Sequence, residues 1–266
     1  MNNPISHLWQ KYHAYFTEEV ADTPISETIS TAVENPSELL VHLGALRQHL
    51  LRAALALVIT TSLAFALNSY ILDFLSQPIG GLDQMVAIDV TEPLATVMRV
   101  SLLVGFAIAL PYIVFEIFLF IAPALSGKSR MLGLLAIPAS LLLFIGGAAF
   151  AYFVMLPVAV PFLMNIKDIT TQVRPSSYIS FVSRVIFFVG LTFEFPLIIL
   201  VLASMGVVKA KTLLKGWRIA IVVIAIIAAV ITPTIDPVNM AIVMGPMIVL
   251  YFLSVLLAYI PIKGRN

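Results

Sequence analysis

The segment YISFVSRVIFFVGLTFEFPLIILVLASM, residues 178–205, decides the fold class of this chain. Its only charged residues are Arg184 and Glu194, and it is longer than the ~20 residues that a helix needs to cross a bilayer. A carboxyl group at the centre of such a helix makes the free energy of membrane insertion less favourable by about 2.5–3.5 kcal/mol. We therefore expect Glu194 to face a polar cavity, a neighbouring helix that it hydrogen-bonds, or a partner span, rather than lipid.

The rest of the chain has the same character. Of its 266 residues 61% are hydrophobic and only 11% are charged, whereas about 25% are charged in soluble domains. The predicted fold class is therefore an all-α membrane protein with six transmembrane helices. Besides 178–205, the apolar segments are 50–72, 93–122, 131–156, 217–232 and 238–260. The pair Gly146–Gly147 in the third span predicts close helix packing.

The distribution of lysine and arginine predicts the orientation in the membrane. An even number of spans places both termini on one side, and eleven of the 15 basic residues fall on that side. Because basic loops stay inside, we expect a multi-pass protein of the cytoplasmic (inner) membrane with both termini cytoplasmic. The net charge of +1 gives no electrostatic argument for nucleic acid.

Three regions differ in composition. Residues 1–37 form an acidic segment, predicted to be a cytoplasmic tail whose aromatic and aliphatic residues fit an amphipathic helix over 4–20. Residues 38–260 hold all the spans, and 261–266 form a short cytoplasmic tail. The chain has no cysteine, and its histidines lack the spacing of a zinc helix. We therefore expect no metal, no cofactor and no catalytic residue, and so no enzymatic activity.

Several motifs occur in an order that resembles one known family. They are HLGALRQHLLRA (42–53), LPYIVFEIFLFIAPAL (110–125), GAAFAYFVMLP (147–157), YISFV (178–182), FEFP (193–196) and ITPTIDP (231–237). Together they resemble TatC, the multi-spanning subunit of the twin-arginine protein translocase.

This resemblance implies a cup-shaped bundle with two short C-terminal spans. It also implies a protein that receives the signal peptides of folded exported proteins and recruits single-span TatA and TatB partners. Such a protein works as a homo-oligomer within a larger complex, and the proton-motive force, rather than catalysis by the chain, drives transport.

The same resemblance implies a set of functional residues. The residues implied in signal-peptide binding are Leu46, Arg47, Phe120 and Arg130. Glu194 is implied in contact with a partner span. The residues implied in the structure of the outer face are Pro78, Tyr152 and Asp236.

Two positions depart from the family pattern. The family usually has glutamate where this chain has Ala45 and Ser129, and those carboxylates are held to receive the paired arginines of the signal peptide. Alanine and serine cannot pair a guanidinium bidentately. Glu116, near the cytoplasmic end of the second span, and Glu38, seven residues before position 45, are candidate replacements. The simpler interpretations are a snorkelling Glu116 and a helix-start acid at Glu38.

Two other functions stay open at this point. One is a diverged TatC paralogue that has lost arginine recognition and acts in assembly, as the residues at 45 and 129 suggest. The other is a small-solute or ion transporter that uses Glu194, against which stands the absence of an internal repeat.

The predicted topology can be tested by labelling single cysteines introduced at Ser69, Ser129, Ser176 and Asn266. A membrane-impermeant reagent should reach positions 69 and 176 from outside, and positions 129 and 266 only after the membrane is opened. Labelling of position 129 or 266 in intact cells would refute the arrangement.

Overall fold

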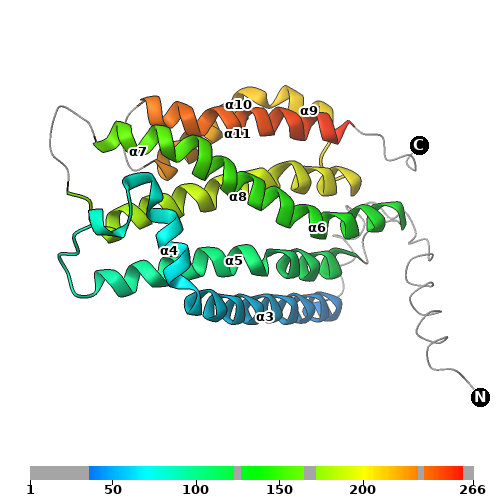
Figure 1. Cartoon of the computed structure of the whole chain (residues 1–266). Coiled ribbons are helices and arrows are strands. Elements are labelled where there is room, and N and C mark those ends of the chain that lie inside the picture. Colours follow the sequence, from blue (N-terminus) through cyan, green and yellow to red (C-terminus); the bar gives the residue numbers. More distant parts are fainter. Residues whose placement is uncertain (1–35, 123–126, 165–171, 233–236, 260–266) are drawn as a thin grey trace, which may run out of the picture.

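The computed structural model describes residues 36–122, 127–164, 172–232 and 237–259, although not the side chains of 36–42, 127–129, 132 and 239. These residues form helices and short turns, with a single parallel bridge between Met85 and Val173 in place of any sheet. The N-terminal segment 1–35, with its expected amphipathic helix, lies outside the described residues. Figure 1 shows the long helices side by side, with the α6–α7 segment crossing the bundle obliquely.

The first long helix, α3 (Pro36–Ala66), runs without a break through the segment expected to precede the first span. After Leu67 the chain turns away into α4 (Asn68–Ser76), which crosses the bundle axis in Figure 1. The Asn68 side-chain amide donates to the Phe65 carbonyl at 2.6 Å, a polar contact that helps to end the helix. The first span is thus Leu43–Ala66 rather than the predicted 50–72.

The next three predicted spans are confirmed as long apolar helices. They are α5 (Glu92–Ile121), α6 (Gly127–Phe150) with its continuation, and α8 (Pro175–Ser204). The third continues to Met164, beyond the predicted residue 156, through a π-helical turn (Ala151–Met155) and α7 (Leu156–Met164). The turn ends two residues before Pro157, whose ring would clash with the carbonyl four residues earlier in a regular helix.

The C-terminal part consists of α9 (Ala210–Lys215), α10 (Trp217–Ile231) and α11 (Pro237–Ala258). With 15 residues α10 is about 22 Å long, which is less than the ~30 Å of bilayer hydrocarbon. The described residues therefore contain five helices long enough to span a membrane and one shorter apolar helix. This agrees with the predicted six spans and the short fifth.

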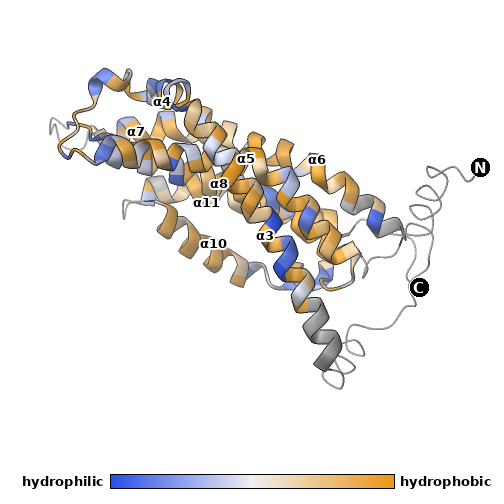
Figure 2. Ribbon diagram, turned by 90° about the horizontal axis from the view of Figure 1, so that it is seen from below, coloured by the Kyte–Doolittle hydropathy of each residue, from blue (hydrophilic) through white to orange (hydrophobic). Residues whose placement is uncertain are grey.

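The core is centred on α8, against which α5, α6 and α11 pack. Its buried face includes Ile179, Val182 and Val189. Phe106 of α5 lies between two aromatic rings, with centroid distances of 5.7 Å to Phe144 and 5.1 Å to Phe187. Figure 2 shows hydrophobic residues along the length of the helices, and many large apolar side chains are exposed on the outside. A soluble protein would bury such a surface, so its natural solvent is lipid.

Glycines set the closest approaches between helices. A Cβ atom added to Gly105 of α5 would lie 2.6 Å from the Cα of Thr61 on α3. One added to Gly147 would lie 2.9 Å from the Cα of Gly190 on α8, which confirms the packing role predicted for this position. Gly146 has open space around it, so the prediction was wrong for that residue. A helix presents adjacent residues to different sides, and only one of the two faces a neighbour.

Substitution of Gly105 by alanine should destabilise the protein, because the methyl group would force α3 and α5 apart. The expected loss is about 1–3 kcal/mol in the free energy of unfolding. The matched control is Gly146→Ala, which adds the same methyl group to open space. Thermal unfolding of the two purified variants in detergent gives the comparison. Equal melting temperatures would mean that α3 and α5 do not pack this closely.

Candidate functional site

Charged side chains gather towards the two ends of the bundle. One end, which we call the basic end, is where α3 and α10 begin and α5 and α8 finish. Its described basic side chains are Arg47, Arg52, Arg130, Lys209, Lys211, Lys215 and Arg218. The opposite end, the α4 end, holds the short helix α4 and the turns η1 (Gln77–Ile79) and η2 (Leu82–Gln84), together with the acids Asp73, Asp83, Asp89 and Glu92.

Glu116 is the centre of a polar cluster at the basic end. It lies on the last turns of α5 and only 3% of it is exposed. Its Oε2 is 2.6 Å from Nδ1 of His49, which lies on the facing helix α3. The Tyr112 hydroxyl, one turn earlier on α5, is a second hydrogen-bond partner. Arg52 lies further away, with Nη1 4.0 Å from Oε2. Among acids whose side chains the structure describes, Glu116 alone lies at this end.

The cluster offers a buried carboxylate to a cation. Burying an unpaired carboxylate is costly, so the hydrogen bonds from His49 and Tyr112 make its position tolerable. The Phe120 ring meets the His49 ring edge-on, at 6.1 Å between centroids, and so limits its movement. The Arg52 side chain is 55% exposed and makes the loosest of the three contacts. An incoming guanidinium could therefore take its place without disturbing the buried part of the cluster.

The structure brings several sequence-predicted residues to the same end. Ala45 and Leu46 are half-buried on α3, one turn before His49, and Arg47 is exposed.

Arg130 is placed differently, because it is 4% exposed and its Nε donates to the carbonyl of Ala122 at 3.0 Å. It therefore holds the end of α5 to the start of α6. The side chains of Glu38 and Ser129 lie outside the described part of the structure.

Sequence reasoning missed His49, Arg52 and Tyr112. The spacing of the histidines speaks only to metal binding, and His49 is 67 residues from Glu116 in the chain. A signal was present, since His49 and Arg52 are three residues apart and share a helix face. A basic pair of this kind predicts an acidic partner, and Glu116 is the acid near the end of the next span.

The α4 end has its own ion pair. Glu92 is 5% exposed and pairs with Arg174, which precedes α8. Its carboxylate also accepts hydrogen bonds from Ser176 Oγ and from the backbone N–H of Ile88, both at 3.2 Å. These contacts tie the start of α5 to the start of α8. Beside them, hydrogen bonds from the backbone and side chain of Thr91 lower the pKa of Asp89.

Two of the predicted outer-face residues, Tyr152 and Pro78, lie at this same end. The Tyr152 hydroxyl donates to the Phe74 carbonyl at 2.6 Å, and the two rings stack at 4.3 Å between centroids. The π-helical turn thereby holds α4 across the bundle. Pro78 lies in η1 and is half-buried. Asp236 lies outside the described residues.

Glu194 is buried within the bundle rather than exposed to lipid, with 5% of its surface accessible. The backbone of Phe144 on α6 hydrogen-bonds its carboxyl group. Its Oε1 has no hydrogen-bond partner among the residues that the structure describes. Glu194 thus has unused hydrogen-bonding capacity near the middle of α8.

The fold and its charged ends define an integral, multi-spanning membrane protein. The family described as Sec-independent protein translocase protein (TatC) matches residues 41–246, and this chain belongs to it.

Individual relatives agree with this assignment. The TatC protein of Carboxydothermus hydrogenoformans is 31% identical over 228 residues, which cover 85% of this chain and 94% of that protein. The TatC protein of Aquifex aeolicus is 34% identical over 233 residues, covering 85% and 96%. A crystal structure of the twin-arginine translocase receptor TatC superimposes with a TM-score of 0.72 at 33% identity, covering 82% of this chain and 97% of that one. A second, in DDM, gives 0.75 at 32% identity, covering 82% and 100%.

Proposed function

We propose that this chain is the receptor subunit of a twin-arginine protein translocase and that Glu116 supplies the carboxylate for its signal peptides. Family membership and the two receptor structures support the general function. The observation that carries the assignment of Glu116 is its position at the basic end, across from the helix that carries Ala45, Leu46 and Arg47. Glu116 would take over from the acids missing at positions 45 and 129.

The proposed binding step is an exchange of cations. An arginine of the signal peptide approaches the exposed side of the cluster and displaces Arg52 from Glu116. His49 and Tyr112 keep their hydrogen bonds, so the carboxylate remains in position. Charge-assisted hydrogen bonds of this kind contribute about 1.5–3 kcal/mol. The basic side chains around the cluster would repel a free cation, so further contacts along the peptide have to add to the binding.

Glu116→Gln should weaken binding of a twin-arginine peptide by about tenfold or more, because the amide keeps the shape and loses the charge. The control is Asp83→Asn, the same type of change at the exposed α4 end. Binding is measured by fluorescence of a labelled peptide with the purified protein, beside a twin-lysine peptide. Unchanged affinity for Glu116→Gln would exclude it as the receptor acid.

A second candidate function is a TatC paralogue that acts in assembly and no longer reads arginine pairs. The observation in its favour is that Glu116 already has partners within the chain. The double change Ala45→Glu with Ser129→Glu separates the two functions. A receptor that relies on Glu116 should bind the peptide before the change and gain affinity after it. The paralogue should bind only after the change.

The remaining properties follow from the proposed function. Both termini lie in the cytoplasm, in line with the lysine and arginine residues of the basic end, and the membrane is the cytoplasmic one. The chain works in an oligomeric complex with single-span TatA- and TatB-type subunits. The proton-motive force drives transport, and the chain itself performs no catalysis. Glu194 is the proposed contact for a partner span, since its Oε1 is buried without a described partner.

Glu194→Ala should leave folding intact and weaken association with the single-span subunit, because the partner loses a buried hydrogen-bonding group. Glu194→Gln should retain the association. Ser183→Ala is the control, since Ser183 Oγ is another buried, unpartnered group on α8. Co-purification of the tagged partner measures the effect. Wild-type association and transport in Glu194→Ala would leave the residue without this role.

A further inference from the structure

An apolar pocket opens between α8, α9, α10 and α11, away from the Glu116 cluster. Its volume is about 630 Å³, which is within the ~300–1,000 Å³ of small-molecule sites. Its wall includes Phe188 and Phe195 of α8, Ile219, Ala220 and Val223 of α10, and Met247 of α11. Glu194 does not line it. The pocket exists because α10 packs mainly on α11 and makes few contacts with α8.

The polar groups in the wall of the pocket are largely used within the protein. The Tyr251 hydroxyl donates to the Leu213 carbonyl at 2.6 Å. The Thr192 hydroxyl donates to the Phe188 carbonyl at 2.8 Å. Such a pocket has little to offer a polar ligand, whereas a hydrocarbon chain would fill it with a gain from apolar contact.

Basic side chains stand where the pocket meets the basic end. Lys215 directly precedes Gly216, and Arg218 directly precedes Ile219, and both of these neighbours line the pocket. Lys211 is one turn before Lys215 on α9, so the two share a helix face. All three side chains are exposed, and none takes part in an ion pair with a described residue.

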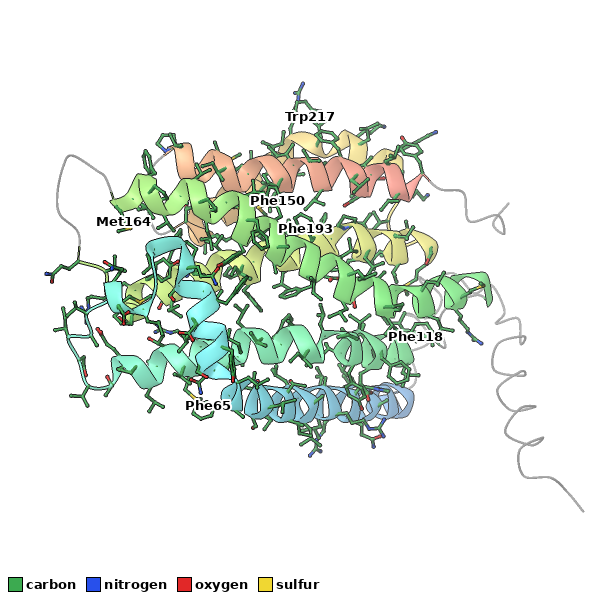
Figure 3. All side chains as sticks on the ribbon, in the orientation of Figure 1. Phe65, Phe118, Phe150, Met164, Phe193 and Trp217 are labelled. Carbon is green, nitrogen blue, oxygen red and sulfur yellow. The ribbon has the colours of Figure 1, made fainter. Side chains whose placement is uncertain are left out.

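The residue between these cations fits the boundary between lipid and water. Trp217 is 40% exposed, and the Arg218 guanidinium lies 5.6 Å from its ring centroid. Tryptophan concentrates at the level of lipid headgroups. Figure 3 shows Trp217 on the outer side of the bundle, where α9 meets α10. The basic residues therefore lie at headgroup depth, directly beside an acyl-sized pocket.

We propose that this pocket binds one acyl chain of an anionic phospholipid, whose phosphate is held by Lys211, Lys215 and Arg218. Basic pockets between transmembrane helices are known to select anionic headgroups. A bound lipid would fill the gap between α8 and α10 and so fix the short helix α10 against the bundle. The charge of the three cations favours this occupant over a partner helix, which would need only the apolar wall.

Thermal unfolding of the full-length protein in a neutral detergent tests the proposal. Phosphatidylglycerol should raise the melting temperature, whereas phosphatidylcholine and inorganic phosphate should not. Arg218→Gln and Lys215→Gln should each weaken the response by about fivefold in lipid concentration, as expected for one basic residue near a charged headgroup. Both side chains are exposed, so these variants should fold normally.

Ala220→Phe should abolish the response by filling the pocket, and Ala229→Phe, on an exposed part of the same helix, should retain it. If phosphatidylcholine raised the melting temperature as much as phosphatidylglycerol, the stabilisation would come from non-specific surrounding lipid. If inorganic phosphate did so, the basic residues would form a site for free anions. Either result overturns the proposal. It would also fail if Ala220→Phe kept the response to phosphatidylglycerol but lost the single-span subunit, because a partner helix would then occupy the groove.

Discussion

In a lipid environment, buried polar groups have to find their partners inside the protein. This constraint explains where the polar side chains of this chain lie. Glu92 is paired with Arg174 at one end of the bundle, and Glu116 with His49 at the other. Tyrosine hydroxyls donate hydrogen bonds to backbone carbonyls, as the Tyr152 hydroxyl does to the carbonyl of Phe74. Each of these contacts joins two segments that are far apart in the chain, so satisfying the polar groups also fixes the tertiary structure.

The helix α8 shows how this constraint and apolar packing combine. Its start is tied to α5 by the contacts of Glu92 with Arg174 and Ser176. Its middle approaches α6 closely, because Gly190 and Gly147 lie against each other. Two polar groups of this helix, Glu194 Oε1 and Ser183 Oγ, are buried without a described partner. Thr61 Oγ1 is the other buried side-chain atom without a described partner, but Glu194 is the only carboxyl group among the three.

The two ends of the bundle have different characters. At the α4 end, the Glu92–Arg174 ion pair and the tyrosine hydrogen bonds connect the turns and helix starts, so these polar groups have their partners within the chain. At the basic end, the exposed Arg52 makes only a loose contact with Glu116, and the cations of α9 and α10 form no ion pair with a described acid. The first end is therefore built for structure, and the second has charge available for ligands. The proposed receptor site and the proposed lipid site both belong to that second end.

Four features can be predicted from the amino-acid sequence alone: the membrane class, the six apolar helices, the short fifth span and the family resemblance. These features rest on the length and hydrophobicity of local segments, which do not depend on how the helices pack. The packed structure was needed to show that Glu116 meets His49, that Arg130 holds α5 to α6, and that Gly147 rather than Gly146 touches a neighbouring helix. It also showed α3 ending at Ala66, where Asn68 bonds the backbone. Such contacts depend on the rotation and spacing of whole helices, which local hydrophobicity does not specify.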